Sequence, residues 1–346
     1  MRSYLDESAT NHLPPATNQL NGEKYNWVVS RDASGRRLDQ FVASRLSGES
    51  RSQIQNWIRK GFVTVGGAAV KTGYRTRVGD AVALEIPWTP PPQPFPEEIP
   101  LDVLYEDADI AAINKPAGMS CHAGAGLRSG TLVNALLYRM GRIEAGNPER
   151  PGIVHRLDKF TSGVIITAKN NFSHRRLARQ FKAREVKKEY IALVHGVPTP
   201  PVGTIDLAIG RDPNNRKKMS VRARHKRDAV THYTIKESFG FAALLDIRIE
   251  TGRTHQIRVH LAAKGYSVVG DFLYGGNRVK NLPAPIAKIV ESMGRPFLHS
   301  SRIEFAHPRS GEKLAFQAPI PEELVSLLYS IQPGKAPLER AIFCND

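Results

Sequence analysis

Two segments near the amino terminus place apolar residues at helical spacing. In residues 36–46 (RRLDQFVASRL), one face of the expected helix holds Leu38, Phe41, Val42 and Leu46, and Arg45 shares the spacing. In residues 49–61 (ESRSQIQNWIRKG), the inward positions are Ile54, Trp57 and Ile58. Ser50 and Ser52 are the candidate N-caps of this second helix, and Gly61 is expected to end it.

A change to alternating periodicity follows these helices. Residues 62–70 (FVTVGGAAV) alternate around Gly66-Gly67, which predicts a β-hairpin, and residues 73–87 supply a further turn and strand. Residues 1–26 are polar and non-periodic, and we expect them to be disordered. Residues 87–100 contain seven prolines. Such a segment continues neither a helix nor a central strand, so we expect a semi-rigid linker over 88–100.

Strands dominate the pattern from residue 101 onward. Two short strands separated by acidic turn residues are predicted within 101–124, an amphipathic helix over 130–140, a buried strand over 163–169 and a basic helix over 171–184. Further strands are expected at 187–196, within 231–250 and at 313–320. Many strands are neighbours in sequence, which predicts an α+β domain built on a mixed, largely antiparallel sheet.

Composition limits the class of protein. The chain has 346 residues, enough for two domains, and 41% of them are hydrophobic. Its two cysteines are too few for a disulfide framework and lack metal-ligand spacing, which favours a reducing compartment. The amino terminus has no apolar core typical of a signal peptide, and no apolar run reaches about 18 residues. We therefore expect a soluble cytoplasmic protein without a membrane partner, and a monomer by default.

Charge points to a polyanionic partner. Lys and Arg total 49 against 33 Asp and Glu, a net charge of +16. The basic residues are clustered in 173–188 and in 210–229, which reads as a hairpin. A merely basic surface is the alternative, but clustering favours nucleic acid.

One carboxylate stands among cations in a candidate chemical site. Asp158 lies between His155, Arg156 and Lys159, directly before the buried strand. It is either a turn-capping residue or a nucleophile, and a nucleophile must stay ionised, which a nearby guanidinium favours. Composition does not choose among the arginines. Phosphate-loop, dinucleotide, zinc-protease and serine-hydrolase motifs are absent, so no cofactor and no metal are expected.

The helix, helix and hairpin pattern of residues 27–87 resembles the S4 RNA-binding domain, a small αL-like unit. The resemblance rests on RLDQFVASRL, SRSQIQNWIRKGFVTVGG and VGDAVAL. Gly66-Gly67 stands where that family usually has Asn-Gly, and both dipeptides suit a two-residue turn. In S4 domains the second helix and its flanks face RNA, which implies RNA-binding roles for Arg51, Gln55, Arg59 and Lys60. Two solvated helix faces are the alternative.

Three motifs of the remaining chain resemble the RluA/RluD-type pseudouridine synthases. They are HRLDKFTSGVIITAK, KKEYIALVHG and GRTHQIRVHL followed by GDFLYGG, and they occur in the family's order. INKPAGMSCHAG, RDPNNRKKMSV with DAVTHY, and residues 297–321 add support, so the resemblance covers about residues 100–325. It implies the pseudouridine synthase fold, with a catalytic domain over 101–330 and a tail over 331–346.

The resemblance assigns roles to individual residues. It implies that Asp158 is the nucleophile, that Tyr190 lies against the uracil ring and acts in proton transfer, and that Arg258 pairs with Asp158. Ile257 and Leu261 would help to wall the pocket, and His155 and Arg156 would orient the catalytic turn or clamp the RNA. Further substrate-binding positions are Arg253, Thr254, His255 and Gln256. Candidate contacts to the RNA backbone outside these motifs are Arg176, Arg179, Lys217 and Lys218.

The implied activity is isomerisation of uridine to pseudouridine in structured RNA. The S4 domain and the basic hairpin favour large-subunit ribosomal RNA, with transfer RNA as the alternative. Two rival functions are a non-catalytic RNA-binding protein and a glycoside hydrolase. A hydrolase generally needs two carboxylates at a defined separation, and Glu185, Glu189 and Asp271 are weaker second candidates.

Overall fold

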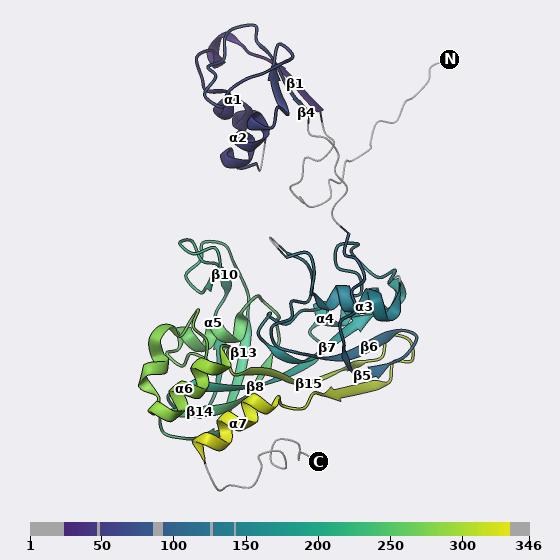
Figure 1. Cartoon of the computed structure of the whole chain (residues 1–346), viewed down its shortest axis with the longest axis vertical. Coiled ribbons are helices and arrows are strands. Elements are labelled where there is room, and N and C mark those ends of the chain that lie inside the picture. The colour runs from purple at the N-terminus through teal and green to yellow at the C-terminus, as the bar shows by residue number, and fades with distance from the viewer. Residues whose placement is uncertain (1–23, 47–48, 86–92, 125–126, 142, 333–346) are drawn as a thin grey trace, which may run out of the picture. The chain divides into compact units, whose positions relative to one another are not determined.

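The computed structural model describes residues 24–332 except 47–48, 86–92, 125–126 and 142. Contacts divide the chain into two units, residues 1–91 and residues 92–346 (Figure 1). Most of the expected amino-terminal disorder, the first part of the linker and nearly all of the expected tail lie outside the described residues. No helix in the described ranges is both long and apolar enough to cross a membrane.

The first unit is a four-stranded antiparallel sheet with two α-helices. The strand order is β1 (Lys24–Val28), β4 (Ala81–Glu85), β2 (Val63–Val65), β3 (Ala68–Ala69). A 3-10 helix η1 (Arg31–Ala33) precedes α1 (Leu38–Arg45) and α2 (Arg51–Arg59). The apolar positions predicted on both helices are buried in one core with Val63, Val82 and Leu84.

Local signals account for most of this unit. The Ser50 hydroxyl accepts a hydrogen bond from the backbone N–H of Gln53, which makes Ser50 the N-cap of α2. Gly66 and Gly67 have φ of +57° and +80°, the left-handed conformations that a tight two-residue hairpin turn requires. The predicted helices and hairpin are confirmed.

The expected disorder over residues 1–26 is wrong for residues 24–26. They begin the edge strand β1, which pairs along its whole length with β4. Only Tyr25 and Trp27 of this strand pack against the core, and their rings stack with centroids 5.5 Å apart. Because Lys24 and Asn26 alternate with them, the apolar signal is too short to stand out in the sequence.

The second unit contains a nine-stranded sheet. Eight strands follow the order β5 (Asp102–Glu106), β6 (Ile110–Lys115), β7 (Ser162–Ala168), β15 (Leu298–Ala306), β8 (Lys187–His195), β14 (Ala242–Ile249), β13 (Val230–Ser238), β9 (Val202–Asp206). The ninth, β16 (Lys313–Gln317), pairs with β15. Every pair is antiparallel except β7 with β15, which confirms the predicted sheet.

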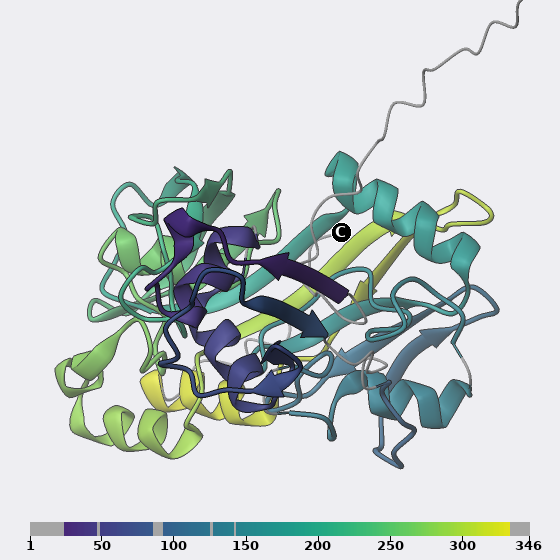
Figure 2. The same ribbon diagram turned by 90° about the horizontal axis from the view of Figure 1, so that it is seen from above.

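Helices cover both faces of this sheet (Figures 1 and 2). Alternate residues of β8 show the division. Ile191 and Leu193 pack in the cluster with α6 (Ala284–Met293) and α7 (Glu322–Ile331). Tyr190, Ala192 and Val194 belong to the other cluster, which includes residues of α3 (Leu132–Met140), α4 (Asn171–Ala183) and α5 (Gln256–Ala263). A 3-10 helix, η2 (Gly276–Asn281), precedes α6.

Two segments differ from what the sequence predicts. The basic segment 210–229, expected as a hairpin, forms a three-stranded sheet of β10 (Ile209–Arg211), β11 (Met219–Ser220) and β12 (Lys226–Arg227). The end of the expected linker belongs to the second unit: the Asn134 amide donates to the Phe95 carbonyl at 2.8 Å, and Glu97 N–H donates to the Asn134 carbonyl. The extended, proline-rich chain exposes these backbone groups, and α3 supplies their partners.

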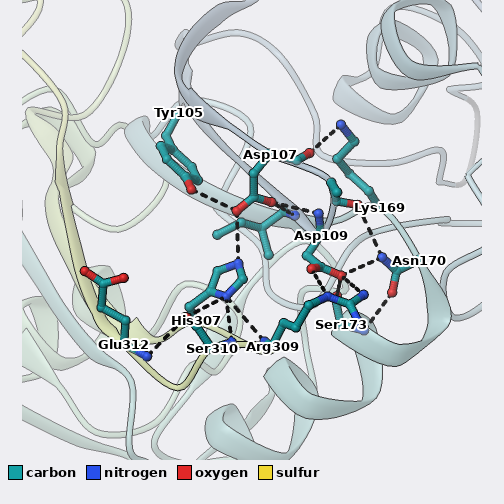
Figure 3. Close-up of polar contacts among 12 residues, drawn as sticks. Tyr105, Asp107, Asp109, Lys169, Asn170, Ser173, His307, Arg309, Ser310 and Glu312 are labelled. Atoms are coloured by element: carbon teal, nitrogen blue, oxygen red, sulfur yellow. Dashed lines mark hydrogen bonds and ion pairs between the residues drawn. The ribbon is translucent and has the colours of Figure 1, made fainter.

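A polar cluster anchors α4 to the sheet (Figure 3). Asp109, 3% exposed, accepts two hydrogen bonds from the Arg309 guanidinium at 2.5 and 2.7 Å and one from the Ser173 hydroxyl. His307 Nε2 lies 2.9 Å from Asp107 Oδ2. The cluster joins the β5–β6 turn, the first turn of α4 and the β15–β16 hairpin, so it fixes where α4 lies on β7.

Candidate active site

Asp158 lies on the turn that enters β7. The Asp158 carbonyl accepts a hydrogen bond from Thr161 N–H, which closes the turn. The buried Lys115 ammonium, at the end of β6, donates to the carbonyls of Met119 at 2.9 Å and Lys159 at 3.4 Å. Burial lowers the pKa of Lys115 to about 8. The turn is thus tied to the neighbouring strand rather than free to move.

Arg258, in the first turns of α5, joins two carboxylates. Its Nη1 donates to Asp158 Oδ2 at 3.3 Å, while Nε and Nη2 donate to the two oxygens of Asp271 at 2.7 and 2.9 Å. Arg258 and Asp271 are 8% and 3% exposed. The bidentate pair with Asp271 therefore holds the guanidinium in one orientation, with one N–H directed at Asp158.

A pocket of about 640 Å³ opens beside Asp158. Tyr190 on β8 forms part of its wall, is 6% exposed, and burial raises the pKa of its phenol well above the usual range. The predicted site residues that line this pocket are His155, Arg156, Asp158, Tyr190, Arg253, Thr254, His255, Gln256, Ile257 and Arg258.

Leu261 is the exception among the residues expected to wall the pocket. It is 1% exposed, packs in the main core and does not line the pocket. Leu261 follows Ile257 by one helical turn, about 6 Å along α5. Only the amino-terminal turn of that helix reaches the pocket.

His155 braces the turn that carries Asp158. Its Nε2 accepts a hydrogen bond from the Ile166 N–H at 2.9 Å, and its ring stacks on Phe181 with centroids 4.7 Å apart. Burial lowers the pKa of His155 to about 3, so the imidazole is neutral at physiological pH. This geometry favours an orienting role over a cationic clamp on RNA. Arg156, by contrast, is exposed on the turn and lines the pocket.

The segment before α5 is held by its own side chains. Gln256 is buried, and its Oε1 accepts from the Thr251 hydroxyl at 2.7 Å and from Arg253 N–H. Its Nε2 donates to the Val230 carbonyl at 2.9 Å. Gln256 thus braces this segment against β13, and it also lines the pocket in which it was predicted to bind substrate.

His255 stands next to Asp158. It caps α5 in a left-handed conformation with φ of +56°, and its Nδ1 lies 2.7 Å from the Tyr274 hydroxyl. Its Nε2 is 3.9 Å from Asp158 Oδ2. Burial lowers the pKa of His255, and Asp158 acts in the opposite direction.

The predicted RNA-binding residues differ in their exposure and in their contacts with the rest of the protein. In the first unit, Arg51 Nε and Gln55 Nε2 donate to the buried Asp39 carboxylate at 2.9 and 2.6 Å, whereas Arg59 and Lys60 are exposed. In the second unit, exposed Arg176 and Arg179 lie on α4 and Lys217 is exposed on the loop before β11. Lys218 is half-buried, with Nζ 5.9 Å from the Tyr274 ring centroid.

The structure adds three residues to the site that the sequence analysis did not assign to it. Asp271 appeared in sequence only as a weak second carboxylate, although its motif GDFLYGG was visible. Lys115 was visible in INKPAG, and Lys188 in KKEY. The roles of these residues depend on their contacts with distant segments, and no periodic pattern in the sequence predicts such contacts. Among the described residues, no three His, Cys, Asp or Glu side chains are grouped as metal ligands.

Comparison with known proteins identifies the family. The family model described as RNA pseudouridylate synthase matches residues 109–263, and that of the S4 domain matches residues 36–82. Uncharacterized RNA pseudouridine synthase YlyB of Bacillus subtilis is 39% identical over 306 residues, 88% of this chain and 97% of its own. The chain belongs to the RluA/RluD-type pseudouridine synthases.

Further relatives agree with this membership. Ribosomal large subunit pseudouridine synthase D of Xanthomonas campestris is 42% identical over 311 residues, 89% of this chain and 93% of its own. The solved structure of Human RNA Pseudouridylate Synthase Domain Containing 4 is 27% identical, with a TM-score of 0.52 over 67% of this chain and 93% of that one. The predicted family, fold class and enzyme class are confirmed: the chain is an RNA pseudouridine synthase carrying an S4 domain.

Proposed function

We propose that this enzyme isomerises uridine in large-subunit ribosomal RNA, with Asp158 as its nucleophile. One observation carries the choice of Asp158. Two carboxylates line the pocket within the described chain, Asp158 and Glu250. Glu250 is engaged by His232 at 2.9 Å and by Arg184 at 3.4 Å. Asp158 instead faces the buried Arg258, beside the Tyr190 ring.

The chemistry needs one ionised carboxylate. Along one route, Asp158 attacks C1′, the C1′–N1 bond breaks, and its electrons leave with the uracil as an anion. The uracil turns, C5 attacks C1′, and the ester bond to Asp158 breaks. Along the other route, Asp158 removes the C2′ proton as the C1′–N1 bond breaks, and the proton returns to C2′ after C5 joins C1′. In both routes the C5 proton is finally lost and N1 gains one.

The surrounding residues have separate tasks in this proposal. Tyr190 lies against the uracil ring, and because its phenol stays protonated it can donate or relay a proton. Arg258 pairs with Asp158 at 3.3 Å and orients its carboxylate. Arg156, Arg253 and Thr254 contact the flipped nucleotide at the pocket opening. His155 and Gln256 act behind them by bracing the two segments that form the site.

RNA outside the pocket is bound through its backbone. We place the exposed Arg176, Arg179 and Lys217 against phosphates near the target, with Lys218 beside them. In the S4 domain, exposed Arg59 and Lys60 are the stronger candidates, since Arg51 and Gln55 already bind Asp39. We also propose that the enzyme is a monomer and that it acts in the cytoplasm. Sedimentation of the purified protein tests the first proposal, and cell fractionation tests the second.

Pseudouridine mapping tests the target. Total RNA from cells with and without the gene is compared at single-nucleotide resolution. We expect one or more large-subunit sites to disappear with the gene and to return with the wild-type copy but not with Asp158→Ala. Loss of sites in transfer RNA alone would replace the ribosomal target by the alternative. Full restoration of the sites by Asp158→Ala would remove Asp158 from the mechanism.

A further inference from the structure

Lys188 is a buried ammonium in the wall of the active-site pocket. It is 6% exposed, lies on β8 and lines the same pocket as Asp158. Its Nζ donates to the Glu250 backbone carbonyl at 3.3 Å and lies 5.9 Å from the Phe181 ring centroid. A lysine has three N–H donors, and the described residues supply an acceptor for one of them. The other donors are free for a ligand.

The charge of Lys188 is not neutralised by the protein. In the described part of the chain, no carboxylate forms an ion pair with its Nζ. The groups that interact with it electrostatically are cationic Arg184 after α4, neutral His155 from the turn that carries Asp158, and Glu250 after β14. Cationic Lys182, near the end of α4, lines the same pocket. The Glu250 carboxylate is taken by His232 and Arg184. A desolvated cation without a counter-charge is costly, so an anionic partner would be strongly favoured there.

Position relates Lys188 to the reacting nucleotide. Lys188 and Tyr190 are two residues apart on β8 and both are buried on the pocket side, which places their Cα atoms about 7 Å apart. That spacing is on the scale of one nucleotide. The carboxylate end of the pocket suits the sugar and base, and the Lys188 end suits what adjoins them in the strand.

We propose that Lys188 binds a phosphate of the RNA strand that flanks the target uridine. This assignment rests on the proposed function. Uracil carbonyls and ribose hydroxyls are uncharged acceptors, whereas a phosphate supplies the counter-charge that the protein omits. Lys188 is therefore a substrate-binding residue, which anchors the flipped nucleotide while its base turns. It has no bond to make or break in the reaction.

Three full-length variants test this role with protein-free large-subunit ribosomal RNA transcript as substrate. Lys188→Met fills the space without a charge, Lys188→Arg keeps the charge, and Lys187→Met is the matched control. Lys187 is the exposed neighbour on the opposite side of the strand and pairs with Glu304 at 2.8 Å. Thermal unfolding confirms that each variant folds. We expect Lys188→Met to raise KM about tenfold with kcat nearly unchanged, and to reduce the slope of log KM against log salt by about 0.7.

The pH dependence separates Lys188 from other groups. Burial, with a smaller contribution from Arg184, lowers the pKa of Lys188 to about 8. Phosphate binding needs the protonated form, so wild-type KM should rise about tenfold between pH 7 and pH 9. The pKa of Lys115 is also about 8, so Lys115 could cause a similar rise in KM. Lys188→Arg separates the two residues, because it keeps Lys115 and the charge at position 188. If Lys188 is responsible, the KM of Lys188→Arg should stay level between pH 7 and pH 9. A rise that persists in Lys188→Arg would overturn the assignment.

Neutral phosphates complete the test. Synthetic RNA around the mapped uridine carries a methylphosphonate at one flanking phosphate or the other. One replacement should weaken wild-type binding about tenfold and leave Lys188→Met unaffected, because the two changes remove one contact. If each methylphosphonate weakens binding by the same factor in the wild type and in Lys188→Met, Lys188 contacts neither phosphate and the assignment is refuted. If the wild type forms no pseudouridine, the proposed function fails, and unchanged transcript affinity and salt slope in Lys188→Met would then refute the phosphate site separately.

Discussion

Removing the charge of Asp271 should slow the reaction without weakening RNA binding. Asp271 does not line the pocket, yet it accepts two of the three hydrogen bonds that Arg258 makes to carboxylates. In Asp271→Asn, an amide N–H₂ faces the guanidinium donors, so Arg258 loses its fixed orientation. A displacement of about 1 Å at a reacting group can cost about 100-fold in rate. We therefore expect kcat to fall about 100-fold and KM to change less than about threefold.

Stability must be separated from rate in this experiment. Breaking a buried ion pair costs about 3–5 kcal/mol, so Asp271→Asn should also lower the unfolding temperature. Asp109→Asn is the matched control, because Asp109 is equally buried and holds Arg309 by two hydrogen bonds (Figure 3), and neither residue lines the pocket. It should cost about 1.5–3 kcal/mol and leave kcat unchanged. Tritium release from 5-tritiated uridine in RNA gives kcat and KM when it is measured at a temperature at which each variant is folded.

The outcome decides whether the orientation of Arg258 by Asp271 matters for catalysis. If Asp271→Asn retains kcat within about threefold of the wild type, the orientation of Arg258 by Asp271 has no catalytic role. If Asp109→Asn loses as much activity, the loss in both variants reflects the fold. The account requires a large loss in the first variant and none in the second.

Three further predictions concern stability. Ser50→Ala removes the cap of α2 and should destabilise the S4 domain by about 1 kcal/mol in chemical denaturation, with the catalytic domain's transition unchanged. Gly163→Ala should give little folded protein, because φ is +112° and a Cβ would lie 2.2 Å from the Ser300 carbonyl oxygen; normal yield and melting would contradict this. Hydrogen bonds from Arg309 depress the pKa of Asp109, so its stabilisation is present above the ordinary value of 3.8 and lost as pH falls below it. Acid unfolding should therefore begin at higher pH in Arg309→Met.

The sequence predicts those parts of the fold that local chemistry determines. Ser50, Gly66 and Gly67 specify a cap and a turn through their own backbone, so the S4 unit follows from its pattern. Strand β1 escapes prediction because only Tyr25 and Trp27 face the core. Helices α6 and α7 are amphipathic, but their place against the far face of the sheet depends on β8 and β14.

The site is harder to predict than the fold. Asp158 and Arg258 are 100 residues apart, and family resemblance, rather than periodicity, pairs them. Resemblance marks positions in motifs but not what each side chain touches. It therefore assigned Leu261 to the pocket wall, whereas the structure buries Leu261 in the core behind the site. It also did not indicate that Gln256, which lines the pocket, holds the segment before α5 through its side chain. The clamp by Asp271 and the unpaired charge of Lys188 appear only when separate segments meet.

Tritium release by wild type and Asp158→Asn tests the central claim most directly. The substrate is large-subunit ribosomal RNA transcribed with 5-tritiated uridine, because tritium leaves only when C5 loses its hydrogen. The variant keeps the shape of the side chain and removes its charge. We predict stoichiometric release by the wild type and no release by Asp158→Asn, although the variant still binds the RNA. Release by the variant at the wild-type rate would contradict the account.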